Sequence, residues 1–440
     1  MKRILFHIFC LFACISVSAQ YVVKGGAGEP LHATTGGGGV VLVYLLNTLN
    51  GGEISFTSDD DGTHNWYKYD RDPNIATPIS CTQNGRTSYI TGIEDGWGYY
   101  MGKTNSSQTR YIWIIDYSQY VPRLSSINVN AGDDECEGIQ IIAPVDAEPL
   151  YYYSGSGDGV RRNEVTRNYT FSYNTLRWDD KEFYFDDHLA EIKLEGIVNE
   201  FPIPAPLIDT KFTLRGDSFA EHFGIEQSIT SANEYEAVAI EAYAEAIPLH
   251  DSGDGESTED DGSLKSAPYS VLFRAAANEP TAAMFRWKID KLQEDNTYST
   301  IISRQGDREF EHTFNEDGHY KAEVEVTNKY STCPVVISMN ISVASSEMAV
   351  PNYFSPGNSS GYNNEFKVSY RSITNFKCSI TNRWGNLLYT WNDPELGWDG
   401  RINGMYVATG VYFYHIEYTD SQGKKQSKKG SINVLRETQQ

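Results

Sequence analysis

Acidic pairs and histidines are the side chains of this sequence that could perform catalysis. The pairs Asp179-Asp180 and Asp186-Asp187 could serve glycoside hydrolysis, which needs two carboxylates. The 440-residue chain holds 59 Asp and Glu, however, so close pairs also arise by chance. Its nine histidines are scattered, and there is no HExxH pattern, no GxSxG nucleophile elbow and no P-loop. We therefore expect no catalytic residues and no enzymatic activity.

The acid-rich run from Asp251 to Gly262 (DSGDGESTEDDG) is the candidate metal-binding loop. An EF-hand loop needs oxygen ligands at positions 1, 3 and 5 and a Glu at position 12. Counted from Asp251, positions 3, 5 and 12 are glycines. The run has six acids and no apolar residue, which predicts a solvated linker over 251–266. No CxxC pattern suggests zinc, so we expect neither a metal nor a cofactor.

Aromatic clusters could bind sugars by stacking on their rings. Three short runs carry them, at 66–69, 97–100 and 151–153. Because side chains alternate between the two faces of a strand, about half of each cluster is expected in a core. Rings exposed together on one face would favour a surface glycan-binding protein, which is the alternative function. An uncharacterised hydrolase is the third.

Charge separates the end of the chain from the rest. The net charge is −23, which argues against nucleic acid as a partner because phosphate binding needs clustered cations. Residues 349–440 hold ten Lys and Arg against seven Asp and Glu, a net of +3, so the preceding residues carry −23 − 3 = −26. A basic module on an acidic body predicts a separate unit with a separate task. Lys424, Lys425, Lys428 and Lys429 form a basic hairpin that could meet an acidic secretion channel or polysaccharide, or simply keep a sheet edge charged.

The N-terminus reads as a targeting segment. Lys2 and Arg3 precede an apolar stretch from Ile4 to Val17, and small residues follow up to Ala19. This pattern predicts a signal peptide over 1–19. Lipidation of Cys14 is the alternative. Four cysteines remain in the mature chain, spread about one per module, and we expect mostly buried free thiols; they are Cys81, Cys136, Cys333 and Cys378.

Short apolar runs separated by Gly, Asp and Pro predict an all-β fold of tandem immunoglobulin-like β-sandwich modules. The expected divisions are a β-sandwich over 20–122, an immunoglobulin-like β region of one or two modules over 123–250, a third sandwich over 267–346 and a C-terminal domain over 349–440. In the third sandwich, Tyr320, Ala322, Val324 and Val326 alternate with polar residues, which predicts a strand with one buried face.

The third sandwich resembles a polycystic-kidney-disease-type immunoglobulin-like domain. The resemblance lies in residues 314–328 (FNEDGHYKAEVEVTN) with Trp287 upstream. The WxFGDG-like segment of that family is missing, since Trp287 is followed by Lys288-Ile289-Asp290.

The last ninety residues carry six ordered motifs. Residues 376–381 and 387–391 predict two strands joined by a turn, and a later strand puts Tyr412, Tyr414, Ile416 and Tyr418 on one face and Val411, Phe413, His415 and Glu417 on the other. The residues that carry the motifs are Pro351, Asn352, Phe354, Ser355, Pro356, Asn382, Arg383, Trp384, Gly385, Asn386, Trp398, Asp399, Gly400, Gly404, Gly410, Tyr412, Tyr414 and Gly430.

Together these motifs resemble the gliding-motility-associated C-terminal domain, the type B sorting domain of the type IX secretion system of Bacteroidetes. The resemblance implies Sec export, then passage across the outer membrane with this domain as the signal and the type IX machinery as partner. It places the protein outside the cell, secreted or on the surface, with the preceding modules in a structural or adhesive role. Surface polysaccharide or other surface proteins are further possible partners. Residues 357–364 lack the aspartates usual in the family, which puts any cation bound there in doubt.

Overall fold

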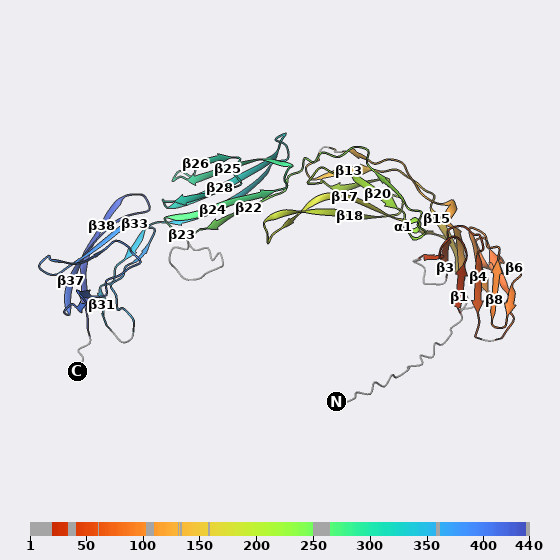
Figure 1. Ribbon diagram of the computed structural model, residues 1–440, viewed down its shortest axis with the longest axis horizontal. Helices are drawn as coiled ribbons and strands as arrows, with labels where there is room; N and C mark the ends of the chain where they lie inside the picture. Colours follow the sequence, from red (N-terminus) through yellow and green to blue (C-terminus); the bar gives the residue numbers. More distant parts are fainter. Residues whose placement is uncertain are drawn as a thin grey trace, which may run out of the picture. The chain divides into compact units, whose positions relative to one another are not determined.

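The computed structural model describes residues 20–33, 41–59, 61–102, 110–130, 132, 134–156, 159–249, 265–357 and 361–436. The predicted signal peptide and nearly all of the predicted acidic linker lie outside these residues. Within them the only α-helix is α1 (Ser218–His222), and strands form most of the regular structure, so the expected all-β fold of tandem sandwiches is confirmed (Figure 1). No helix in the described part of the chain is long and apolar enough to span a membrane.

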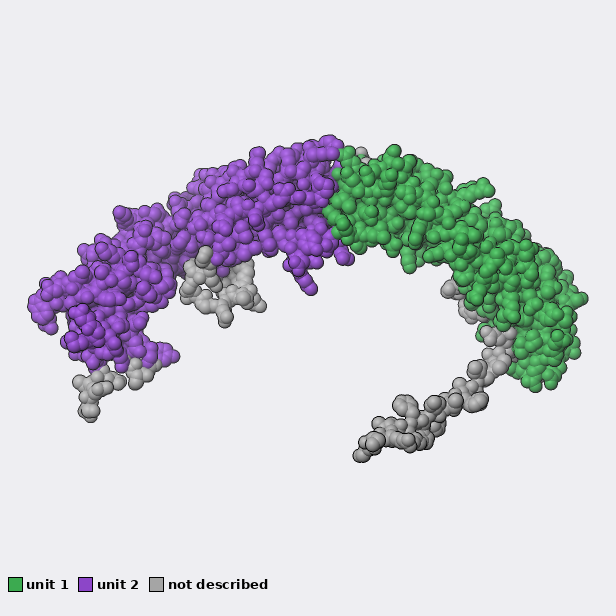
Figure 2. Space-filling model, in the orientation of Figure 1, with its two compact units in different colours: residues 1–176, 187–237 green, residues 177–186, 238–440 purple. Residues whose placement is uncertain are grey.

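The chain divides into two compact units (Figure 2). Unit 1 comprises residues 1–176 and 187–237, and unit 2 comprises residues 177–186 and 238–440.

Unit 1 begins with a sandwich of two sheets. The first sheet has the order β1-β4-β8-β7, and the second has the order β2-β3-β10-β9-β5-β6. Strand β10 pairs in parallel with β3, and all six of its residues are buried. The bounds are β1 (Gln20–Lys24), β2 (Leu31–Ala33), β3 (Val41–Leu46), β4 (Glu53–Thr57), β5 (Trp66–Tyr69), β6 (Thr77–Ile79), β7 (Thr82–Asn84), β8 (Thr87–Thr91), β9 (Trp97–Met101) and β10 (Tyr111–Asp116).

The second part of unit 1 is another two-sheet sandwich. A three-stranded sheet, β12-β13-β19, packs on a four-stranded sheet, β18-β17-β20-β21, through a core that includes Ile141, Phe171 and Phe212. Two smaller pairs, β11-β14 and β15-β16, flank it. The bounds are β11 (Arg123–Leu124), β12 (Asn128–Asn130), β13 (Gly138–Ile142), β14 (Val145–Asp146), β15 (Leu150–Ser156), β16 (Gly159–Val165), β17 (Asn168–Asp179), β18 (Tyr184–Glu195), β19 (Glu200–Pro204), β20 (Phe212–Gly216) and β21 (Gln227–Thr230).

The two sandwiches of unit 1 share a core. Ile112 and Ile114 of β10 face the first sheet, whereas Trp113 belongs to a second cluster with Tyr152 of β15 and Phe219 of α1. This alternation explains why β10 is an unbroken apolar run: both of its faces are covered. At the same joint, Asp217 accepts hydrogen bonds from Tyr117 and, at 2.5 Å, from Arg167, and the Arg167 and Asp217 side chains are essentially unexposed.

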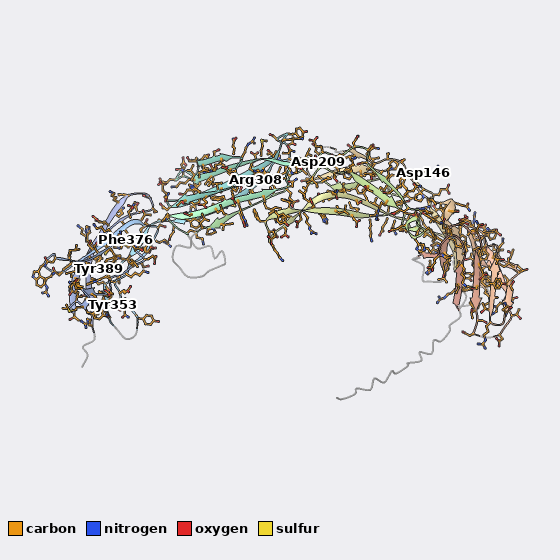
Figure 3. All side chains as sticks on the ribbon, viewed as in Figure 1. Asp146, Asp209, Arg308, Tyr353, Phe376 and Tyr389 are labelled. Atoms are coloured by element: carbon orange, nitrogen blue, oxygen red, sulfur yellow. The ribbon has the colours of Figure 1, made fainter. Side chains whose placement is uncertain are left out.

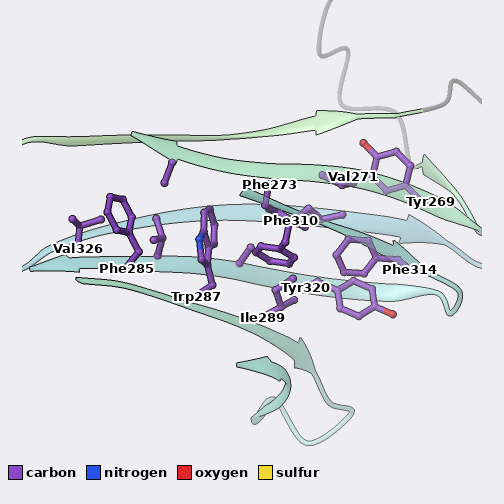
Figure 4. Close-up of a cluster of buried hydrophobic side chains, with 14 of the residues drawn as sticks. Tyr269, Val271, Phe273, Phe285, Trp287, Ile289, Phe310, Phe314, Tyr320 and Val326 are labelled. Atoms are coloured by element: carbon purple, nitrogen blue, oxygen red, sulfur yellow. The ribbon is translucent and has the colours of Figure 1, made fainter. Parts of the chain in front are cut away.

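Unit 2 begins with the third sandwich. A three-stranded sheet, β22-β24-β27, packs on a five-stranded sheet, β23-β29-β28-β25-β26. Trp287 lies between them, in edge contact with Phe273 and Phe310 (Figure 4). The predicted alternation in β28 is confirmed, because Tyr320, Ala322, Val324 and Val326 are all buried. The bounds are β22 (Ala242–Pro248), β23 (Lys265–Ser266), β24 (Tyr269–Ala277), β25 (Ala282–Leu292), β26 (Tyr298–Gln305), β27 (Glu309–Phe314), β28 (Gly318–Asn328) and β29 (Val335–Ala344).

The C-terminal domain completes unit 2. Its main sheet has the order β31-β38-β37-β33-β34, and two small pairs, β30-β32 and β35-β36, accompany it. Buried hydrogen-bonding serines join this domain to the third sandwich: Ser372 accepts from Ala267 N, and Ser421 accepts from Ser346 N. The bounds are β30 (Glu347–Ala349), β31 (Tyr353–Phe354), β32 (Ser369–Arg371), β33 (Thr374–Thr381), β34 (Leu387–Trp391), β35 (Arg401–Ile402), β36 (Met405–Tyr406), β37 (Gly410–Thr419) and β38 (Lys425–Val434).

The expectation of mostly buried free thiols holds for only half of the mature cysteines. Cys81 and Cys378 are free, and burial raises the pKa of the Cys378 thiol to about 12. For Cys136 and Cys333 the expectation is wrong, because both are disulfide-bonded. Spacing along the sequence does not reveal which thiols approach one another in space.

Candidate functional site: the C-terminal domain

Trp398 organises the interior of the C-terminal domain. Its side chain is fully buried, 5.5 Å from the Phe354 ring and 5.8 Å from the Tyr412 ring between centroids. Its indole N–H donates to the carbonyl of Arg401, and its backbone exchanges two hydrogen bonds with Phe366. Three motifs far apart in the sequence therefore meet at one indole ring. The ring is packed by other aromatic rings, and its N–H is hydrogen-bonded.

The motif Asn382–Asn386 closes the β33–β34 hairpin. The Asn382 side-chain oxygen accepts hydrogen bonds from the backbone N–H groups of Trp384 and Asn386, each at 3.0 Å. Gly385 has φ +83, a conformation that costs glycine least. Asn382 thus does the work of turn formation, whereas Trp384 is 74% exposed and contributes nothing to the core.

Two glycines of the motifs are required by close contacts. A Cβ at Gly400 would lie 2.9 Å from the Pro356 ring, and Gly400 also has φ +73. A Cβ at Gly430 would meet the Tyr414 ring at 2.4 to 2.9 Å, since Tyr414 and Gly430 are opposite each other on β37 and β38. At both positions, a neighbouring ring occupies the space that a side chain would need, so only glycine fits.

The other motif residues lie at strand ends and turns. The Asn352 carbonyl accepts from the backbone and side chain of Asn433. Asp399 accepts from the N–H of Arg401, and Tyr412 donates its hydroxyl to the Ala408 carbonyl. The structure therefore brings the sequence-predicted residues together in one domain, but as core, turn and strand-end residues rather than as a pocket.

The predicted alternation in β37 is confirmed. Ile416 is fully buried in the domain core, and Tyr412, Tyr414 and Tyr418 pack against it. Val411 and Phe413 point the other way and are 49% and 43% exposed.

The aromatic clusters of unit 1 are poor platforms for sugars. Trp66, Tyr99 and Tyr100 are at most 2% exposed. Trp97 is half-buried, and the Lys68 ammonium lies 4.3 Å from the centroid of its ring. These candidate stacking rings are therefore buried in the core or covered by another side chain.

The acidic pairs and a serine–histidine pair do not form a catalytic centre. Asp179 accepts from the backbone N–H groups of Lys181 and Glu182, so it stabilises the β17–β18 turn. His64 lies 2.7 Å from the Ser88 hydroxyl, but Ser88 is fully buried and also accepts from the Trp66 indole. A substrate cannot reach such a hydroxyl. The described residues contain no group of three or more His, Cys, Asp or Glu placed to hold a metal ion.

Comparison with known families identifies two domains. Residues 348–434 match the CHU_C type IX secretion signal domain, which confirms the resemblance inferred from the C-terminal motifs. Residues 128–231 match a fibronectin type III domain, an immunoglobulin-like β-sandwich that lies upstream. No curated protein matches the chain.

Two solved structures align along most of the chain. A tetra-tandem repeat from the extending region of a large adhesion protein is 11% identical, covers 90% of this chain and 99% of its own, and has a TM-score of 0.22. The BSP domain of a biofilm-associated protein is 9% identical, covers 96% of each chain and has a TM-score of 0.16. At these TM-scores neither likeness bears on the fold or the function.

Proposed function

We propose that this chain, which carries a type IX secretion signal domain over 348–434, is exported cargo, that this domain is the outer-membrane translocation signal, and that the preceding sandwiches serve a structural or adhesive role. The domain match supports export and a secreted or cell-surface location. On this proposal a signal peptide over 1–19 first takes the chain across the inner membrane. The secretion machinery is the partner of the last domain.

The observation that carries the proposal is how the C-terminal domain is built. It has its own hydrophobic core, with eight residues that are fully unexposed: Phe354, Phe366, Cys378, Ile380, Trp398, Ile416, Ile432 and Val434. The motif residues of its resemblance hold turns and strand ends rather than any ligand. A partner would recognise such a domain by its folded surface, and this is what a transport signal needs and a catalytic module does not.

The structural or adhesive role of the preceding modules is supported by where their side chains are used. Large aromatic residues of the first sandwich and of the third, such as Trp66 and Trp287, lie in cores between sheets. We include in this proposal that the third sandwich is a polycystic-kidney-disease-type domain, as its sequence predicts. Such sandwiches can act as spacers, and they would bind surface proteins or polysaccharide through their loops and the outer faces of their sheets.

Deletion of residues 349–440 tests the transport role. Wild-type and deleted chains are expressed in the native host, and protease is added to intact cells. We expect the wild-type chain to be digested or released, and the deleted chain to remain protected in the periplasm. A chain lacking residues 20–237 is the matched control and should still be exported, because this deletion removes both sandwiches that share a core and keeps the third sandwich with the C-terminal domain. Equal surface exposure with and without 349–440 would reject the proposal.

A further inference from the structure

The outer face of the main C-terminal sheet carries an apolar patch. Thr381 of β33 and Phe413 of β37 lie directly opposite each other and share a face, and Leu387 of β34 pairs with Thr381 just beyond a register shift in the β33–β34 ladder. Val411, Asn433 and Tyr353 form the next row on the same face. Leu435 lies one residue beyond the end of β38, and its N–H donates to the Phe354 carbonyl, so the hydrogen bonding with β31 extends to it. We define the outer patch as Tyr353, Leu387, Val411, Phe413 and Leu435.

Every member of the outer patch is substantially exposed. The exposed fractions are 47% for Tyr353, 62% for Leu387, 49% for Val411, 43% for Phe413 and 49% for Leu435. Strands lie about 4.8 Å apart and residues i and i+2 about 7 Å apart, so Val411 and Phe413 are direct neighbours. Thr381 lies between Phe413 and Leu387, and Asn433 lies between Val411 and Tyr353, so the patch spans the sheet with these two polar residues within it. Trp384, 74% exposed, lies on the turn that leads directly to Leu387. Contiguous exposed apolar surface on a secreted domain marks an interaction site rather than scattered surface residues.

The outer patch lies at the free end of the domain. The third sandwich contacts the opposite end, through Ser372 before β33 and Ser421 after β37. The patch instead lies where β33 ends and β37 begins, as do the motif segments 382–386 and 351–356. In Figure 3, Tyr353 and Tyr389 lie farther along the domain from the third sandwich than Phe376. Nothing in the described part of unit 2 covers this end of the sheet.

The charges beside the outer patch are mainly positive. On the same outer face, register places Lys429 in the row next to Phe413 and Lys377 one row farther, opposite Glu417, whereas Lys425 lies at the far end of the sheet, by the β37–β38 turn. Arg383 lies over the Trp384 ring at 5.0 Å. A complementary surface must therefore be apolar in the centre and acidic at its border.

These features favour a protein over the other possible occupants. A sugar could stack on Tyr353, Phe413 or Trp384 but would gain little from Leu387, Val411 and Leu435, whereas a protein surface can bury all of them, and Trp, Tyr and Arg are the residues enriched where protein–protein contacts are strongest. A second copy of this chain related by twofold symmetry would set the same lysines against one another, which is unfavourable.

We propose that the outer patch, with Trp384 and the lysines beside it, is the docking surface through which the secretion machinery recognises this domain, by way of a protein whose contact region is apolar with an acidic border. This inference rests on the proposed function, because it names the surface through which the export signal acts. Recognition uses the outer face of the sheet together with Trp384, and buried motif residues such as Phe354 and Trp398 support that face from the core.

Paired substitutions in the full chain test the docking surface. The variant Leu387→Ser/Phe413→Ser removes two members of the outer patch, and Leu396→Ser is the matched control, since Leu396 is 57% exposed in the same domain but outside the patch. We expect surface export of the patch variant to fall at least about tenfold, since the loss of hot-spot residues weakens binding by this much or more. The control should be exported like the wild type. Unchanged hydrogen exchange in β33 and β37 shows that both variants fold.

A cross-link identifies the occupant. A photoreactive residue at position 413 should capture a component of the outer-membrane secretion machinery, and one at position 396 should not. The variant Lys377→Glu/Lys429→Glu should lose both export and the cross-link. Three results would overturn the inference: export of the patch variant at the wild-type level, a cross-link only to a second copy of the chain, or one only to polysaccharide. If deletion of 349–440 also leaves export unchanged, the transport role itself fails, which separates the two ideas.

Discussion

At the scale of single residues, two tryptophans of the same motif set have opposite environments. Trp398 is fully buried and Trp384 is 74% exposed. Trp398→Ala should destabilise the C-terminal domain by about 3–5 kcal/mol, because it leaves a large cavity and unpairs the Arg401 carbonyl. Trp384→Ala should change the free energy of unfolding by no more than about 0.5 kcal/mol. Hydrogen exchange of the β33 and β37 amides in the full chain measures both.

The pair also separates stability from recognition. If the outer patch is the docking surface, Trp384→Ala lowers export without changing exchange rates, whereas Trp398→Ala lowers both. Similar exchange rates in the two variants would mean that the core of the domain is not centred on Trp398.

At the scale of elements, the β37–β38 turn depends on one carboxylate. Asp420 accepts hydrogen bonds from Gln426 and from the backbone of Gln422 and Lys424. The Gln426 bond, followed by the backbone bonds, holds the pKa of Asp420 below its ordinary value. Since the folded-state pKa is depressed, this group stabilises the turn above its ordinary pKa of about 3.9, and the stabilisation is lost as pH falls through the folded-state value.

Asp420→Asn tests this pH dependence. At pH 7 the variant should exchange the amides of β37 and β38 faster than the wild type. The difference should shrink as the pH falls below about 4, because the wild-type carboxyl is then protonated as well. A difference that stays constant from pH 7 to pH 3 would contradict the role of the Asp420 charge.

At the scale of the whole molecule, unit 1 should unfold as one body. Its two sandwiches share a core that includes Trp113 and Phe219, and a buried Arg167–Asp217 pair lies at their joint. Arg167→Ala leaves the Asp217 carboxylate buried without its cation and should cost about 3–5 kcal/mol.

Calorimetry of the full chain measures this effect. The unit 1 transition should move to lower temperature without splitting, and Arg161→Ala, an exposed arginine nearby, should leave it in place. Two separate transitions in unit 1 would show that its sandwiches fold independently of the joint.

Much of the fold could be predicted from local sequence patterns. The alternations in β28 and β37 gave the correct buried faces, because a strand must put every second residue on the same side. The Asn382–Asn386 turn was predictable for the same reason, since Asn and Gly at a hairpin have local conformational causes. The C-terminal resemblance rested on these local features in order and was confirmed over 348–434.

What depends on long-range register was not predictable in this way. The outer patch exists because β34, β37 and β31, separated by tens of residues, align Leu387, Phe413 and Tyr353 on one face. The aromatic runs of unit 1 gave no sign that both faces of β10 would be covered, which turned candidate sugar platforms into core. Likewise, only the tertiary structure showed that Cys136 and Cys333 each take part in a disulfide. The sequence by itself determined which residues of each strand share a side, because that follows from backbone geometry. Tertiary structure decided which sides are covered and which remain open to a partner, because that follows from contacts between distant segments.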